Sequence, residues 1–126
     1  MVSGNRKAAD ELYEAYQAQL RSQELKQDEI TEALRKLEKD EMRMEYTRQE
    51  IMWVFRELPN QWSGKQSYDE VDLFEDDFQR CYQQVMNGLD EKREELQSRR
   101  RILYEEEEEY QLEYQRQQMR LQREED

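Results

Sequence analysis

Apolar side chains in the first half of the chain recur in alternating steps of four and three residues from Ala9 to Leu58. Eleven of the fifteen positions in this series are apolar or aromatic, and the spacing never slips. A heptad pattern of this length is typical of a helix that pairs with another helix in a left-handed coiled coil. It predicts a first helix over about residues 5–58. The seam positions are Ala9, Tyr13, Tyr16, Leu20, Gln23, Gln27, Ile30, Leu34, Leu37, Glu41, Met44, Arg48, Ile51, Phe55 and Leu58.

The second half carries a less regular version of the pattern, which predicts a second helix over about residues 68–124. Its seam begins with steps of three, four and four, and such an insertion locally unwinds a supercoil. From Lys92 onward every second seam position is charged, so about one leucine per heptad remains. The predicted seam positions are Val71, Phe74, Phe78, Tyr82, Val85, Leu89, Lys92, Leu96, Arg99, Leu103, Glu106 and Tyr110.

Pro59, the only proline, lies in LPNQWSGKQSYDE, the one stretch rich in turn-forming residues. The residue before a proline disfavours helical backbone angles, so we expect the first helix to end at about Leu58. Ser67 and Glu70 form an S-x-x-E capping box, which favours a new helix start. The sequence therefore predicts one domain over residues 1–126. Its fold is an all-α antiparallel two-helix hairpin with coiled-coil packing and a turn over about residues 59–67.

Pairing residues whose numbers sum to about 129 gives the register of such a hairpin. This register predicts that Phe55 meets Phe74 and that Ile51 meets Phe78. The end of the hairpin next to the turn is therefore expected to be tightly packed. The part farther from the turn is expected to carry polar residues on both helices, with Gln23 and Gln27 near Glu106 and Leu103.

The composition taken alone resembles that of a disordered chain. Charged residues make up 41%, the net charge is −12, and Leu, Ile, Val and Phe together number 22 of 126 residues. However, Ala, Glu, Lys, Leu and Arg number 60 residues, a level typical of long helices and coiled coils. The sustained heptad pattern favours the second interpretation.

The residue types present exclude most catalytic and metal sites. Without histidine there is no imidazole base or ligand, and the single Cys81 can form neither an intrachain disulfide nor a cysteine-rich zinc site. The acidic run at residues 105–109 is expected to be a solvated helix face, because carboxylate metal sites in helical proteins draw on several helices. We therefore expect no enzyme activity, no catalytic residue, no metal and no cofactor.

The chain also lacks features of membrane and nucleic-acid binding. The longest apolar run, residues 51–55, is far shorter than the roughly 20 residues that span a bilayer. The first residues contain no apolar core of a secretory signal. The negative net charge repels nucleic acid and anionic lipid. We expect no membrane span and no nucleic-acid partner. We also expect a cytoplasmic protein, or one exported with its partner by a route that needs no signal peptide.

The apolar run at residues 51–55 covers the whole circumference of the first helix, because successive residues turn by about 100°. A second helix buries only one side of it, so the surplus is expected to form a face for a further helix or for self-association. The alternative is a broad stripe in the two-helix core, with Trp53 half exposed. The predicted partner-binding residues are Ile51, Met52, Trp53, Val54, Phe55, Leu73 and Phe78.

Trp62 and Gly64 form a W-x-G motif at the break between the predicted helices. A helix, W-x-G turn and helix in this order resemble the small WXG-motif proteins exported by bacterial type VII secretion systems. That resemblance implies a Y-x-x-x-[DE] export element near the end of the second helix, which Tyr104 and Glu108 match. The alternative is that Tyr104 is a helical tyrosine followed by a solvated acidic run.

The chain is longer and more charged than plain members of that family. In these respects it is more similar to the small α-helical targeting partners of LXG-domain toxins in Gram-positive bacteria. The resemblance implies a chaperone-like, non-catalytic adaptor that binds the helical LXG domain and promotes its export by a type VIIb machine. A second small helical WXG-like protein would be a further partner. The alternative function is a self-associating structural coiled coil with no export role, whose register is set by Gln23, Gln27, Glu41 and Arg48.

Overall fold

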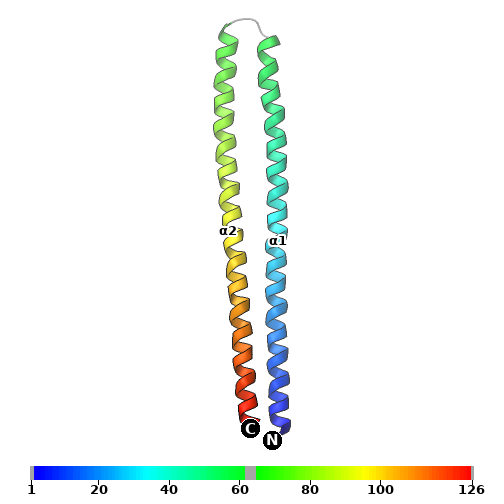
Figure 1. Cartoon of the computed structure of the whole chain (residues 1–126). Helices are drawn as coiled ribbons and strands as arrows, with labels where there is room; N and C mark the ends of the chain where they lie inside the picture. The colour runs from blue at the N-terminus through cyan, green and yellow to red at the C-terminus, as the bar shows by residue number, and fades with distance from the viewer. Residues whose placement is uncertain (1, 62–64, 126) are drawn as a thin grey trace. The chain divides into compact units, whose positions relative to one another are not determined.

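A computed structural model describes residues 2–61 and 65–125, with the side chains of residues 4–57 and 68–124. The described residues form two α-helices, α1 (Val2–Gln61) and α2 (Lys65–Glu125). The helices pack against each other as an all-α helical hairpin (Figure 1). The fold class predicted from the sequence is confirmed.

Both helices extend beyond their predicted bounds. α1 begins at Val2 instead of about residue 5 and ends at Gln61 instead of about Leu58, so it includes Pro59 in its last turn. A proline removes one backbone hydrogen bond and crowds the carbonyl four residues earlier. α1 ends two residues after it. α2 begins at Lys65 and ends at Glu125, against the predicted residues 68–124. The predicted turn motif, Trp62 and Gly64, lies outside the described residues.

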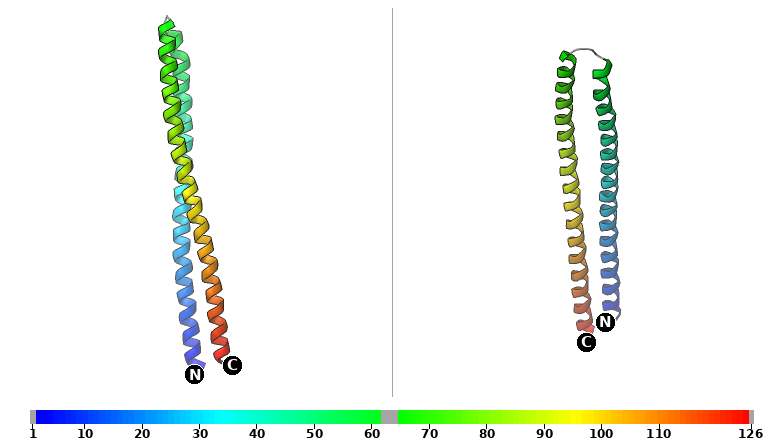
Figure 2. Two further views of the ribbon diagram at one scale, coloured as in Figure 1. Left: turned by 90° about the vertical axis from the view of Figure 1, so that its left-hand side faces the viewer. Right: turned by 45° about the horizontal axis from the view of Figure 1, so that its top comes forward.

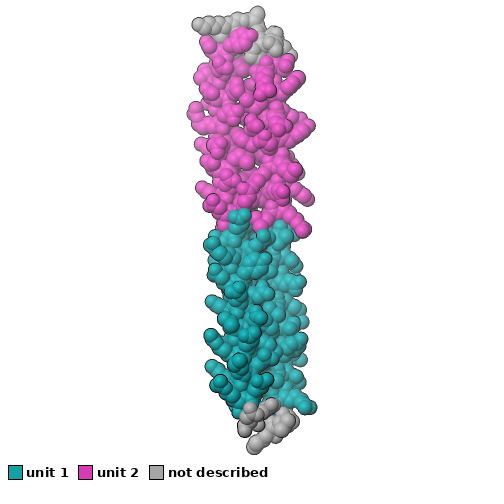
Figure 3. Space-filling model, viewed as in Figure 1, with its two compact units in different colours: residues 1–32, 96–126 teal, residues 33–95 magenta. Residues whose placement is uncertain are grey.

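The chain divides into two compact units, each containing a segment of both helices. Unit 1 comprises Met1–Glu32 and Leu96–Asp126, and unit 2 comprises Ala33–Glu95 (Figure 3). Within each unit, the segment of α1 lies beside an antiparallel segment of α2 (Figure 2). The packing of each unit is described separately.

Unit 1 has a small buried centre that contains one polar residue. Ile30, Leu96 and Leu103 are its buried apolar side chains, and the buried polar residue is Gln23. The Gln23 amide donates a hydrogen bond to the Glu106 carboxylate at 3.1 Å, which confirms the predicted proximity of these two residues. Farther along unit 1, the rings of Tyr16 and Tyr114 stack with centroids 4.3 Å apart.

Unit 2 is held by two buried aliphatic side chains and by contacts between aromatic rings. Leu37 and Val71 are buried. The ring of Phe55 lies 6.1 Å from that of Phe78. The prediction that Phe55 meets Phe74 is wrong, because Phe74 is exposed. Phe55 contacts Phe78 instead, so the contacts near this end of the hairpin differ from the predicted register.

The predicted seam of α1 agrees closely with the observed burial. Of the fourteen predicted positions whose side chains are described, twelve are buried or half-buried. The two exceptions, Ala9 and Tyr13, lie near the start of the helix and are exposed. Regular heptad spacing therefore identified the packed face of α1 correctly.

The predicted seam of α2 is wrong at every second position from Val85 to Arg99. Val85, Lys92 and Arg99 are exposed. The half-buried positions are one residue later, at Met86, Arg93 and Arg100. Charged side chains occupy the packed face here because α1 supplies partners for them. Arg93 forms an ion pair with Glu41, and Arg100 donates a hydrogen bond to Thr31.

Candidate interaction surface

Large apolar side chains are exposed on both helices of unit 2. A concentration of exposed apolar surface commonly marks an interaction site. This unit has few buried apolar residues, so the surface is large for the size of its core. The exposed residues are Met42, Tyr46, Trp53 and Val54 on α1, and Tyr68, Leu73, Phe74 and Val85 on α2.

The structure divides the predicted partner-binding residues into an internal and an exposed group. Phe55 and Phe78 contact each other. The Gln79 amide donates to the thioether sulfur of Met52 at 3.2 Å, and Ile51 is also half-buried. The exposed group consists of Trp53, Val54 and Leu73, and the Trp53 and Leu73 side chains are 62% and 66% exposed.

Tyr46, Trp53 and Val54 form what we call the α1 patch. They line a shallow hollow together with Gln49 and Glu50. Tyr46 was not among the predicted partner-binding residues. Its position seven residues before Trp53 places both aromatic rings on one side of the helix, and this spacing is visible in the sequence. The α1 patch is therefore an aromatic surface about two helical turns long.

A charged cluster lies between the helices in unit 2. The Arg48 guanidinium donates two hydrogen bonds to the Glu45 carboxylate, at 2.7 and 3.1 Å. The Tyr82 hydroxyl of α2 donates to the same carboxylate at 2.8 Å, and the Arg48 guanidinium lies over the Tyr82 ring. The hydrogen bonds from Arg48 and then Tyr82 lower the pKa of Glu45 from 4.5 to about 2. The bond to Glu45 raises the pKa of Tyr82.

Replacing Glu45 by Gln is expected to lower stability near neutral pH and to have less effect in acid. A carboxyl group whose pKa is lower in the folded chain stabilises the fold above its unfolded pKa. That contribution is lost as pH falls from about 4.5 towards 2. Thermal unfolding followed by circular dichroism should show the gap in melting temperature between wild type and Glu45→Gln closing over this range.

The control is Glu38→Gln, which replaces an exposed glutamate on the same helix. Its difference in melting temperature from wild type should stay small over the whole pH range. A gap for Glu45→Gln that is unchanged from pH 7 to pH 2 would contradict the role of this cluster.

Unit 1 contains a second group of polar contacts between the helices. The Gln27 amide donates to the Glu107 carboxylate at 3.1 Å, whereas the register predicted that it would lie near Leu103. The Gln23 side chain is only 3% exposed, and its carbonyl oxygen has no hydrogen-bond partner. Buried polar residues in a coiled coil lower stability but restrict the possible registers. This group therefore favours one alignment of the two helices.

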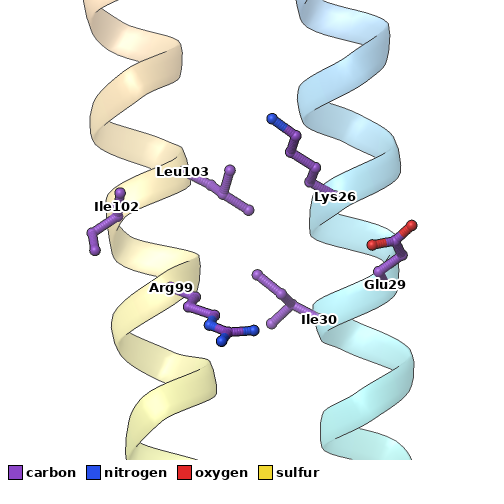
Figure 4. A pocket seen from close by; sticks show the side chains of 6 residues that line it. All are labelled: Lys26, Glu29, Ile30, Arg99, Ile102 and Leu103. Carbon is purple, nitrogen blue, oxygen red and sulfur yellow. The ribbon is translucent and has the colours of Figure 1, made fainter.

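A hollow of about 280 Å³ in unit 1 is lined by side chains from both helices (Figure 4). Ile30 and Leu103 point towards each other, and Ile102 points away from α1. The remaining lining residues are Lys26, Glu29 and Arg99. This mixture of three aliphatic side chains and opposite charges is typical of the flank of a coiled-coil seam.

The residues of the predicted export motif lie on α2 in unit 1. Both Tyr104 and Glu108 are exposed, and they are one helical turn apart. The tyrosine ring and the carboxylate are therefore accessible to another protein. The turn-motif residues Trp62 and Gly64 lie outside the described residues, so only the tyrosine–acid pair can be placed.

Two types of site are absent from the described part of the chain. Among residues 2–61 and 65–125, no group of three or more Cys, Asp or Glu side chains is arranged to hold a metal ion. In the same ranges, neither helix has a stretch with the length and apolar character needed to cross a membrane. The candidate site on the described surface is therefore the set of exposed apolar side chains of unit 2.

These features define a helical hairpin whose most distinctive surface is apolar and exposed. The chain belongs to the family described as "Protein of unknown function (DUF3958)", whose model matches residues 11–124 and so covers most of both helices. Neither the comparison with curated proteins nor that with solved structures found a match.

Proposed function

We propose that this protein is a non-catalytic adaptor that binds the helical LXG domain of a toxin and promotes its export by a type VIIb secretion machine. The observation that carries the proposal is the exposure of Trp53, Val54 and Leu73 in unit 2. Tryptophan side chains such as that of Trp53 are common anchors in protein interfaces. A partner helix that covers them would enlarge the small apolar core of this unit.

The polar seam residues favour the adaptor over the alternative, a self-associating structural coiled coil. That alternative needs these residues to set the register between identical chains. Each of them already has a partner within its own chain: Gln23 bonds Glu106, Gln27 bonds Glu107, Glu41 pairs with Arg93, and Arg48 pairs with Glu45. The first three of these contacts join α1 to α2, and Arg48, paired within α1, lies over the Tyr82 ring of α2. These residues are therefore occupied in contacts of the hairpin itself.

The proposal assigns different tasks to the two units. The exposed apolar residues of unit 2 bind the toxin, and the motif residues Tyr104 and Glu108 are presented to the secretion machinery from unit 1. Trp62 and Gly64 complete the export motif. A second small helical WXG-like protein joins the complex. The complex forms in the cytoplasm, and the toxin leaves by a route that needs no signal peptide.

Replacing Tyr104 by Ala is expected to impair export of the toxin without disrupting its complex with the adaptor. Tyr104 is exposed and lies in unit 1, so its removal leaves the proposed toxin-binding residues intact. Trp62→Ala should have the same effect. The measurement is the amount of toxin in the culture medium, with co-purification of toxin and adaptor from the cells measured in parallel.

Tyr13→Ala provides a matched control for this experiment. Tyr13 is 53% exposed, close to the 50% of Tyr104, but the residue four positions later is Gln17 instead of an acid. The Tyr13→Ala variant should therefore support normal export of the toxin. Normal export with Tyr104→Ala and Trp62→Ala combined would disprove the role of the motif. Failure of the wild-type protein to co-purify with any LXG-domain toxin would disprove the proposed function.

A further inference from the structure

The exposed apolar residues at the start of α2 are surrounded by carboxylates. Residues 68–80 contain six acidic side chains and one basic side chain, Arg80. Five of the six acidic side chains are exposed, and Glu75 is half-buried. Among the side chains that the structure describes, none forms an ion pair with these six carboxylates. This part of α2 therefore combines apolar and negatively charged surface.

Helical spacing places two of these carboxylates directly beside the exposed pair Leu73 and Phe74. Glu70 precedes the pair by three and four residues, and Asp77 follows it by the same intervals. Side chains three and four positions apart are neighbours on a helix surface. Leu73 and Phe74 are thus bracketed by one carboxylate on either side along the helix axis.

An apolar stripe continues from Phe74 along the same side of α2. Cys81 and Val85 are exposed, and they follow Phe74 by seven and eleven residues. At about 100° per residue, the three positions lie within about 40° of one another around the helix and extend over about 17 Å. A straight partner such as a helix can contact these three positions along the stripe, which are about two turns and then one turn apart.

We infer that the acidic face of α2, formed by Leu73, Phe74, Cys81 and Val85 with Glu70 and Asp77, docks a partner helix whose apolar stripe is flanked by Lys or Arg. Burying Leu73 and Phe74 brings the partner's flanking side chains close to carboxylates that have no ion-pair partner among the described side chains. Basic flanks turn that proximity into attraction, whereas acidic flanks would be repelled. The inference rests on the proposed function in that the toxin's LXG domain would supply this helix.

Two other occupants fit the charges less well. A second copy packed through this face would make an isologous contact, in which the same acidic residues approach each other around the two-fold axis. The net charge of −12 adds to that repulsion. An anionic lipid surface would be repelled for the same reason. The α1 patch differs in this respect, because residues 42–57 carry three basic and three acidic side chains.

Two synthetic helical peptides test the inference without requiring the toxin. Both have the same leucine stripe, which is flanked by lysines in one peptide and by glutamates in the other. Binding to the full-length protein is measured by fluorescence anisotropy. The lysine peptide is expected to bind the wild type at least about tenfold more tightly than the glutamate peptide does. It should lose about tenfold in affinity for the double variant Glu70→Gln/Asp77→Asn, and a similar amount for Leu73→Ser.

The double variant Asp10→Asn/Glu11→Gln provides the matched control. It removes the same two charges near the start of the other helix, at exposed positions in unit 1. Its affinity for the lysine peptide should stay within about twofold of wild type, because neither residue belongs to the proposed docking face and exposed charges contribute little on their own. Circular dichroism checks that each variant remains helical.

Three results would overturn the inference. They are equal losses of affinity in the two double variants, equal binding of the two peptides, and a homodimer in light scattering that Leu73→Ser dissociates. These results leave open whether the protein binds an LXG domain. Conversely, failure to co-purify with a toxin, together with the expected peptide results, would disprove the proposed function and leave the chemistry of this face established.

Discussion

Replacing Leu37 by Ala is expected to lower the free energy of unfolding by about 2–5 kcal/mol, the usual range for a buried leucine. The Leu37 side chain is only 4% exposed, and it is one of five buried apolar residues among the described side chains. In a two-helix hairpin, no further layer of structure can compensate for the cavity. Urea unfolding followed by circular dichroism measures the loss.

Leu25→Ala is the matched control for Leu37→Ala. Both substitutions replace leucine by alanine inside α1, so they change intrinsic helix propensity by the same amount. Leu25 is 66% exposed, and its replacement should change stability by no more than about 0.5 kcal/mol. Equal losses in the two variants would mean that the observed packing of α1 is wrong.

Replacing Trp53 by Ala is expected to weaken the complex with the LXG domain by about 2 kcal/mol or more, roughly 30-fold in Kd. Trp53 is the largest exposed side chain of the α1 patch, and a partner that covers it removes a large apolar area from water. The stability of the free hairpin should change little, because the side chain is mostly exposed. Isothermal titration calorimetry with a purified LXG domain measures the affinity.

The choice of Trp53 over Phe55 makes this experiment interpretable. Phe55 is half-buried and contacts Phe78, so Phe55→Ala should lower stability as well as binding. Tyr13→Ala removes an exposed aromatic side chain from unit 1 and should leave the affinity for the LXG domain unchanged. Unchanged affinity in Trp53→Ala would mean that the α1 patch does not contact the toxin.

The sequence predicted the fold class and the packed face of α1 because both depend on a regular apolar repeat. It failed on α2 where Val85 and Met86 offered two apolar residues for one seam position. The choice between them depends on which later side chains find partners across the hairpin. Arg93 and Arg100 can occupy the packed face because Glu41 and Thr31 lie on α1, and one helix taken alone does not contain that information.

The candidate surface was predictable only in part, for a similar reason. The run at residues 51–55 is apolar around the whole circumference of α1, and one neighbouring helix can cover only one side of it. Some exposure of this segment therefore followed from the sequence. Which residues are exposed depends on the rotation of each helix about its axis. That rotation buries part of Phe55 and Phe78, exposes Trp53, and places Phe74 on the surface against the prediction.

The central claim is that the protein binds a helical toxin domain through unit 2. Its most direct test is affinity purification of the tagged protein from its native cell, with the proteins that accompany it identified by mass spectrometry. The account predicts an LXG-domain toxin in near-equal amount with wild type and much less of it with Trp53→Ala. Recovery of the protein as a homo-oligomer with no LXG-domain toxin would contradict the account and support a structural coiled coil.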